Sequence, residues 1–348
     1  MTTHPRARSV QMPDVATDPD AILARLTDVA TPYAVRAAVT LGVPELLADG
    51  PASLGELAAA TGVDADTLGR LLRYLVAHGL FGEPEPQRYA LTDVSRGLIG
   101  EAGAARRAWM DLSGPGARMD AAYGGLAHAL RTGGDGYSAV HGRPLWEDLA
   151  DKPRLRAEFD TLMGTDTATV AHLVATEYDW TGIEHVIDVG GGAGILLTEI
   201  LRARPSMRGT VVDLPRAVDT ARQRFAAAGL GARADAIGGS FFEPLPAGAD
   251  AYIVSRVLTD WNDQAAHDIL RNCVAAARPG GRVLIVEVLP DDSVLAPDSP
   301  YDLQMLAVVG GRLRDADQFT ALAARAGATV AGVRRWDGGL TVIDCRPR

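Results

Sequence analysis

The chain has 348 residues, of which 47% are hydrophobic and 22% charged, and its formal net charge is −10. This length predicts two domains with enough apolar residues for large cores. The negative charge argues against a nucleic-acid partner, because a nucleic-acid footprint needs clustered Lys and Arg. No run approaches the roughly 20 apolar residues of a membrane span, so no membrane partner is expected.

The N-terminal segment, residues 1–19, predicts a flexible arm. It is rich in Pro, Asp and Thr and lacks the apolar core of a signal peptide. We therefore expect a loose segment and a cytoplasmic protein. The two cysteines, Cys273 and Cys345, stand in unrelated contexts, so both are expected to be reduced thiols.

Residues 20–107 predict a winged helix. Ser53 and Glu56 have the spacing of a capping box at a helix start, and a second helix is expected from near Asp64. The stretch 82–99 then resembles a small hairpin followed by another capped helix. Helix, turn, helix and hairpin in this order are typical of a winged helix.

The DNA-binding interpretation of this module is disfavoured by its charge. Residues 1–100 hold eight Arg and no Lys against twelve Asp or Glu. The would-be recognition helix, residues 64–80, offers only Arg70 and Arg73 amid Leu and Tyr. We expect a helix this apolar to pack against a partner subunit rather than against phosphates, and a DNA-binding regulator stays a minor alternative.

Residues 108–180 predict a helical connector that also forms one wall of a pocket. The clearest helical stretch within it is 144–174. His128, His141 and His172 lie in this region without clustered carboxylate or Cys partners. No metal site is therefore predicted.

After residue 180 the chain changes to short apolar runs that alternate with helices. This alternation predicts an α/β domain over residues 181–348, with a mostly parallel sheet covered on both faces. The last two strands are expected to form an antiparallel hairpin. Ligands of such sheets bind at the carboxyl ends of the strands, near the switch in strand order.

The stretch DVGGGAG at the end of the first strand is the strongest signal in the chain. It contains Asp188, Gly190, Gly192 and Gly194. Glycines let the backbone approach a ligand closely. A dinucleotide pattern would require a small residue where Ile195 stands. An acid at this position would repel a phosphate and attract an ammonium group, which favours a cofactor with an amino-acid end, such as S-adenosylmethionine.

A second acid, Asp213, ends the next strand in VVDLP, 25 residues after Asp188. A carboxylate there suits hydrogen bonds to the two hydroxyls of a ribose, and Leu214 would lie against the adenine. The alternative interpretation is a tight strand–helix turn without a ligand.

With these motifs the second half resembles S-adenosylmethionine-dependent methyltransferases. The whole chain resembles the small-molecule O-methyltransferases of plant phenylpropanoid and bacterial natural-product pathways. The resemblance is carried over about 130 residues by DVGGGAG, VVDLP, GGSFFEPLP, VLTDWND, RPGGRVLIVE and DLQMLAVVGGR, in that order, and by the winged-helix half. It implies a Rossmann-like class I methyltransferase domain preceded by an all-helical, winged-helix-like dimerisation domain. It also implies a homodimer, S-adenosylmethionine as cofactor, and a small-molecule pocket between the domains.

The resemblance also implies roles for single residues. Ser240 and Phe241 fall on the adenine side of the cofactor. The family has an acid where Ser240 stands, and a hydroxyl can still hydrogen-bond adenine. Ser255 and Arg256, at the end of the fourth strand, are expected on the cofactor side. The positions that line the substrate pocket in the family correspond here to Trp146, Met163, Trp261, Asp302 and Met305.

The chain departs from the family at the catalytic positions. A histidine that acts as general base on a phenol usually stands where this chain has Thr259. The neighbouring family acid is retained as Glu287, but a second acid is replaced by Leu313. A threonine cannot act as a general base unaided, and such a base typically contributes about 10²–10⁴-fold. Asp260 is expected to orient the substrate or the loop, or to be purely structural.

Three hypotheses follow. The favoured one is methyl transfer by proximity to an already acidic phenol, enol or activated carbon, with Thr259 shaping the pocket or hydrogen-bonding the substrate. The second is a different reaction, such as a hydroxylation or a cyclisation, with the cofactor acting as a positive charge. The third is a binder or regulator without catalysis.

Overall fold

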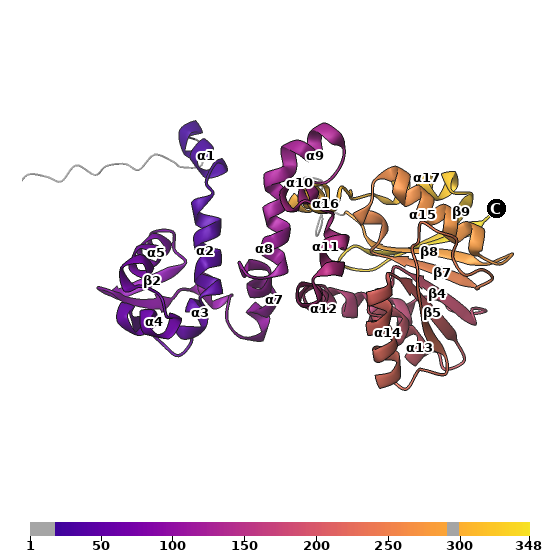
Figure 1. Cartoon of the computed structure of the whole chain (residues 1–348), viewed down its shortest axis with the longest axis horizontal. Helices are drawn as coiled ribbons and strands as arrows, with labels where there is room; N and C mark the ends of the chain where they lie inside the picture. The colour runs from indigo at the N-terminus through magenta and orange to yellow at the C-terminus, as the bar shows by residue number, and fades with distance from the viewer. Residues whose placement is uncertain (1–17, 291–298) are drawn as a thin grey trace, which may run out of the picture. The chain divides into compact units, whose positions relative to one another are not determined.

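The computed structural model describes residues 18–290 and 299–348, so most of the predicted arm, residues 1–17, lies outside it. The chain divides into two compact units, which meet between Gly114 and Pro115 (Figure 1). Most of the predicted connector, residues 115–180, therefore belongs to the second unit.

The first unit consists of short helices and a small sheet. Its elements in chain order are α1 (Pro19–Leu26), α2 (Ala30–Thr40), α3 (Val43–Leu46), β1 (Ala52–Ser53), α4 (Leu54–Thr61), α5 (Ala65–Ala77), β2 (Phe81–Glu85), β3 (Arg88–Leu91), α6 (Asp93–Arg96) and α7 (Gly100–Met110).

The helix starts of the first unit follow the predicted capping chemistry. The Ser53 backbone N–H donates to Glu56 Oε2 at 2.7 Å, which completes a capping box on α4. Asp64 caps α5 by accepting from the Thr67 N–H at 3.0 Å. The predicted hairpin is present as β2 and β3, and β1 pairs with β3 to give the order β1-β3-β2. The module is therefore not all-helical.

The second unit begins with helices and continues as an α/β domain. The helical part holds α8 (Pro115–Asp120), the 3₁₀ turn η1 (Ala121–Gly125), α9 (Leu126–Thr132), α10 (Gly136–His141), α11 (Leu145–Asp151) and α12 (Pro153–Glu177). The α/β part holds β4 (His185–Val189), α13 (Ile195–Ala203), β5 (Arg208–Asp213), α14 (Pro215–Ala227), β6 (Ala234–Gly238), β7 (Ala251–Ser255), η2 (Leu258–Asp260), α15 (Asp263–Ala276), β8 (Arg282–Val288), α16 (Pro300–Val309), α17 (Ala316–Arg325), β9 (Ala328–Arg335) and β10 (Leu340–Pro347).

The seven strands form one sheet in the order β6-β5-β4-β7-β8-β10-β9. Five neighbouring strands run parallel, and β10 pairs antiparallel with both β8 and β9. This confirms the predicted sheet and its closing hairpin. The chain moves outward from β4 through β5 to β6 and then returns to β7, so the switch in strand order lies between β4 and β7. Such a switch point is where a ligand crevice is expected.

Two apolar clusters pack on opposite faces of this sheet. One contains side chains from α12, α13 and α14, and the other contains side chains from α15 and α17 (Figure 1). Cys273 and Cys345 lie in the second cluster as buried, unbonded thiols. Within the described ranges, no helix combines the length and the apolar character that crossing a membrane requires.

Candidate functional site

The glycine loop at the carboxyl end of β4 requires glycine for two reasons. Gly190, Gly192 and Gly194 all have positive φ, at 72°, 55° and 72°, which side chains disfavour. A Cβ at Gly190 would lie 2.7 Å from Val257 Cγ2, and one at Gly194 would lie 2.8 Å from the Phe225 ring. The backbone at Gly190 and Gly194 therefore packs against neighbouring segments, which leaves no room for a side chain at either position.

Asp188, beneath this loop, is a buried carboxylate without a partner. The residue is 1% exposed, and neither carboxylate oxygen accepts a hydrogen bond from the described residues. Burial, and secondarily repulsion from Asp213, raises its pKa to about 7. Buried polar groups are normally paired, so an unpaired carboxylate indicates a missing donor. A ligand ammonium group would supply that donor and the opposite charge.

Asp213 lies at the end of β5, next to β4, and is bound to the glycine loop. Its Oδ2 accepts from the Gly192 N–H at 2.7 Å, and its Oδ1 accepts from the Leu214 N–H at 2.6 Å. Burial raises its pKa, which these two bonds and the Arg156 guanidinium oppose. Each carboxylate oxygen keeps a free acceptor site. Leu214 is 40% exposed, so its side chain is available to a ligand.

The loop after β6 places Ser240 and Phe241 near the glycine loop. Ser240 Oγ accepts from the Phe242 N–H at 3.2 Å. The Phe241 and Phe242 rings pack edge-to-face on Trp261, with centroid distances of 5.8 and 4.9 Å. A Cβ at Gly190 would touch Phe241 at 3.6 Å. The aromatic cluster thus joins the predicted adenine side to the segment that contains Trp261.

Thr259 lies in the turn η2, after a reversal at the end of β7. Half-buried Ser255 ends β7, and Arg256 follows with φ at 55°, an uncommon conformation for a side chain of this size. Thr259 is buried, and its N–H donates to Glu287 Oε1 at 3.3 Å. Its carbonyl oxygen accepts from the Arg312 N–H at 2.9 Å.

Asp260 and Glu287 form a pair of interacting carboxyl groups beside Thr259. Burial raises the pKa of Glu287 to about 7, while the Arg256 charge and hydrogen bonds from Thr259 oppose the rise. Burial and the charge of Glu287 raise the pKa of Asp260 to about 8. Two such groups titrate as a pair, so the site changes charge close to neutral pH.

Two residues of this region escaped the sequence analysis. Tyr301, in the first turn of α16, interacts with the Arg256 side chain and with the charges of Asp260 and Glu287. Burial raises the pKa of its hydroxyl. Nothing in the local sequence pattern marks Tyr301. The other missed residue is Arg314, the second arginine of GGRLR.

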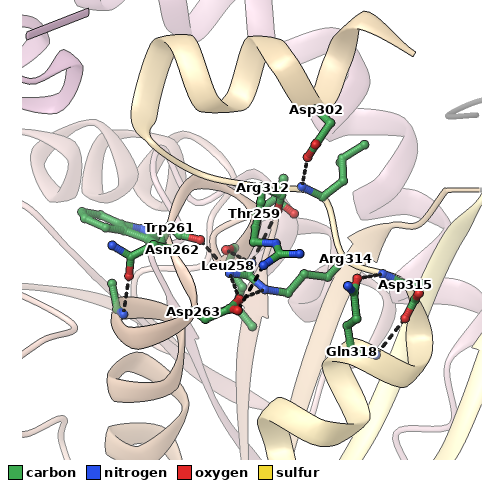
Figure 2. Close-up of polar contacts among 12 residues, drawn as sticks. Leu258, Thr259, Trp261, Asn262, Asp263, Asp302, Arg312, Arg314, Asp315 and Gln318 are labelled. Carbon is green, nitrogen blue, oxygen red and sulfur yellow. Dashed lines mark hydrogen bonds and ion pairs between the residues drawn. The ribbon is translucent and has the colours of Figure 1, made fainter. Parts of the chain in front are cut away.

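The Arg314 guanidinium is buried and forms hydrogen bonds with both ends of the turn (Figure 2). Its Nη1 donates to the Leu258 carbonyl at 2.7 Å, and its Nη2 donates to the Trp261 carbonyl at 2.8 Å. Its Nε donates to Asp263 Oδ1 at 2.9 Å, while Arg312 Nη1 donates to Asp263 Oδ2 at 3.1 Å. Arg314 is 2% exposed. The turn is therefore fixed by a residue far along the chain.

The predicted substrate-pocket residues lie on helices of the second unit and in the turn region. Asp302 is exposed, and its Oδ1 accepts from the Leu313 N–H at 2.6 Å (Figure 2), so this carboxylate stabilises the backbone where the family acid is lost. Trp146 on α11 packs edge-to-face on Phe159 with a centroid distance of 5.9 Å. Trp261, Met163 on α12 and Met305 on α16 are half-buried. Among the described residues, no group of three or more His, Cys, Asp or Glu side chains could hold a metal ion.

Comparison with known proteins gives a consistent family. A family model for an O-methyltransferase domain matches residues 123–329, and a model for an O-methyltransferase dimerisation domain matches residues 25–101. The chain is 43% identical over 308 residues to the 2,7-dihydroxy-5-methyl-1-naphthoate 7-O-methyltransferase of Streptomyces carzinostaticus, covering 88% of this chain and 92% of that protein. It is 39% identical over 322 residues to aclacinomycin 10-hydroxylase RdmB of Streptomyces purpurascens, covering 91% and 86%.

A solved structure is also similar over nearly the whole chain. It is the O-methyltransferase NcsB1 from neocarzinostatin biosynthesis, in complex with S-adenosylmethionine and 2-hydroxy-5-methyl naphthoic acid. The TM-score is 0.85 at 41% identity, with 94% of this chain and 98% of that chain covered. The two chains are therefore similar in sequence as well as in fold.

Proposed function

The chain belongs to the S-adenosylmethionine-dependent O-methyltransferases with an N-terminal dimerisation domain, and we propose that it methylates an acidic hydroxyl of a small aromatic or polyketide-like metabolite. The observation that carries the proposal is the unpartnered carboxylate of Asp188 under the glycine loop. Two of the comparisons support the substrate class, since one names a naphthoate and the other is a structure solved with a naphthoic acid.

The residues present fit the cofactor. When bound, S-adenosylmethionine supplies an electrophilic methyl group on a sulfonium. Asp188 pairs with its ammonium group, and the free acceptor sites of Asp213 bind the ribose hydroxyls. At Gly192 a Cβ would meet nothing within 4 Å, so this part of the glycine loop leaves room for the cofactor to approach the backbone. The remaining contacts of the adenosine and amino-acid ends are assigned to Leu214, Ser240, Phe241, Ser255 and Arg256.

The proposed mechanism depends on orientation rather than on a protein base. A hydroxyl that is acidic enough to bind as an anion needs no proton acceptor, so Thr259 can replace a histidine. Holding the nucleophile in line with the methyl group can contribute roughly 7–11 kcal/mol in well-oriented cases. Thr259 shapes the pocket beside the substrate oxygen, whose lone pair forms the new bond to carbon as the bond to sulfur breaks. Trp146, Met163, Trp261, Asp302 and Met305 form the surrounding wall.

The carboxyl pair gives this mechanism a pH signature. Below about pH 8 the raised pKa keeps Asp260 protonated, so the pair carries at most the charge of Glu287. At higher pH the second charge develops and repels an anionic substrate. We expect the rate to rise with ionisation of the substrate hydroxyl and to fall as Asp260 ionises.

The test uses a series of phenols that differ in hydroxyl acidity, with radiolabelled S-adenosylmethionine. The rising limb of kcat/KM against pH should move with the pKa of each phenol, while the falling limb stays fixed. Titration calorimetry with the demethylated cofactor product checks the cofactor site separately. A rising limb that is identical for all phenols would instead identify the carboxyl pair as the base.

A second candidate is hydroxylation, favoured by the similarity to a protein named as a 10-hydroxylase. The loss of the family base at Thr259 fits this candidate equally well. Product mass separates the two, because methylation adds one carbon and two hydrogens to the substrate while hydroxylation adds one oxygen. Addition of oxygen without any methylated product would replace the first proposal.

The proposal also includes a cytoplasmic homodimer that binds no nucleic acid. The match of residues 25–101 to a dimerisation domain supports the dimer. Light scattering after size exclusion should give twice the chain mass. A gel shift with random duplex DNA at low salt should show no complex.

A further inference from the structure

We propose that Arg314 is a positioning residue that fixes the Thr259–Asp260 turn by holding both of its ends. The inference rests on the proposed function, since it concerns the residues assigned to the substrate side. Arg314 itself is 2% exposed and is not assigned to substrate contact. Its role is to hold Thr259 and Asp260 where they face the substrate.

The hydrogen bonds of Arg314 span the turn. Leu258 precedes Thr259, and Trp261 follows Asp260, and the carbonyl oxygens of both accept from the guanidinium at 2.7 and 2.8 Å (Figure 2). A planar guanidinium has five N–H donors in a rigid fork, so one side chain can fix both ends in a single geometry. A lysine has one ammonium group and cannot reproduce this spacing.

The segment around Arg314 also supports the turn from behind. The Arg312 N–H donates to the Thr259 carbonyl at 2.9 Å. A Cβ at Gly311 would clash with this same carbonyl oxygen, so the two backbones are in close contact. The backbone of residues 311–314 therefore supports Thr259, and the Arg314 side chain extends this support to the carbonyls on either side of the turn.

Arg314 also affects the charge of the carboxyl pair. Its acidic partner Asp263 is 49% exposed and is shared with Arg312, so the buried guanidinium charge is only partly neutralised there. The charge of Arg314 acts on Glu287, where it opposes the rise in pKa that burial causes. Removing the guanidinium is therefore expected to raise the pKa of Glu287 further and to move the first ionisation of the pair to higher pH.

The experiment compares Arg314→Met with Arg312→Met in the full-length protein. Both changes remove a guanidinium that binds Asp263, but only Arg314 binds the two carbonyls of the turn. We expect Arg314→Met to lower kcat by about 10- to 100-fold, because a displacement near 1 Å can cost about 10²-fold. The Kd for the demethylated cofactor product should change less than about 2-fold, and Arg312→Met should leave kcat within about 3-fold.

Two further readouts separate positioning from general destabilisation. The falling limb of the pH profile, which follows Asp260, should stay in place in both variants, because the charge of Arg314 acts on Glu287. Amide exchange of a peptide spanning residues 256–264 should accelerate in Arg314→Met alone. Equal kcat in the two variants, or an unchanged exchange rate, would overturn the proposal.

The experiment also distinguishes failure of the proposed function from failure of the Arg314 proposal. If the wild type binds cofactor but methylates no phenol, the proposed function fails while the exchange comparison still tests Arg314. If Arg314→Met does not fold, Arg314→Lys keeps the charge but replaces the planar fork with a single ammonium group. It should then show a wild-type falling limb with reduced kcat, and wild-type kcat in that variant would refute the need for the fork.

Discussion

The two ends of the candidate site are built in different ways. The core of the cofactor end is one contiguous stretch, residues 188–194, which a hydrogen bond from Gly192 joins to Asp213. The substrate end has no such core and is assembled from three separate parts of the chain, namely the segment 257–263, Glu287 and the segment 311–314. The first end keeps the family's glycine-loop motif and has lost one family acid, at Ser240, whereas the second has lost two of the family's functional side chains.

This difference teaches where a family tolerates change. On the proposed function, cofactor binding depends on the backbone conformation of the glycine loop and on the unpaired Asp188 carboxylate, so a substitution at either is expected to weaken it directly. The substrate end has side chains that orient rather than react, supported by distant residues. A change such as His to Thr at one position leaves the support intact and alters the chemistry alone.

The largest expected effect is at Asp188. Asp188→Asn should weaken binding of the demethylated cofactor product by about 10- to 100-fold, in line with the loss of a charged hydrogen bond worth roughly 1.5–3 kcal/mol. Titration calorimetry measures the change. Asp179→Asn, at an exposed aspartate before β4, is the control and should bind normally. Undiminished affinity in Asp188→Asn would show that the buried carboxylate does not bind the ammonium group.

Asp188 also predicts how the stability of the free protein depends on pH. Its folded-state pKa is raised from 3.8 to about 7, so folding favours the protonated form. The stability from this group is present at pH below about 4 and is lost as pH rises through 7, on the order of a few kcal/mol in total. Between pH 5 and 8, the free energy of unfolding of ligand-free protein, measured with urea, should therefore fall less in Asp188→Asn than in wild type. This range spans the folded-state pKa of about 7.

Gly194→Ala tests whether the loop needs glycine for conformation or for packing. Both costs apply, because φ is 72° and the new Cβ would lie 2.8 Å from the Phe225 ring. Gly229→Ala is the matched control, with φ at 69° and no atom within 4 Å of the new Cβ. We expect Gly194→Ala to lose about 1–3 kcal/mol more free energy of unfolding than the control, as overpacking typically costs. Equal losses in urea denaturation would mean that conformation alone selects glycine.

Thr259→His tests the substrate end by restoring the family base. Weakly acidic phenols should gain about 10-fold or more in kcat/KM, below the upper range of base catalysis because the buried turn must accommodate a larger ring. Strongly acidic phenols should gain nothing, since they bind already ionised. Thr259→Asn, similar in polarity and without a basic nitrogen, is the control. A gain that is the same for all phenols would contradict the missing-base interpretation.

Much of the fold follows from local sequence, and the substrate end does not. The caps at Ser53 and Asp64 depend on residues three positions apart, and each strand is recognised from its own short apolar run, although its parallel partner lies much further along the chain. The strand β1 has only two residues, too few for an alternating pattern. Arg314 lies 56 residues from Leu258, and its register against the turn is set by packing of the second unit. Tyr301 likewise reaches Arg256 through tertiary structure alone.

The smallest expected effect is at Asp302, and its substitution also tests whether the cofactor end and the substrate end are independent. Its bond to the Leu313 N–H is short, at 2.6 Å, but the residue is exposed, so its loss should cost no more than about 0.5–1.5 kcal/mol. Asp302→Ala should loosen the segment 311–314 and lower kcat about 2- to 5-fold, while affinity for the demethylated cofactor product stays unchanged. Asp302→Asn, which keeps an acceptor oxygen, should recover most of the lost kcat. If Asp302→Ala instead weakens cofactor binding, the two ends are coupled and the support of the turn extends to the glycine loop.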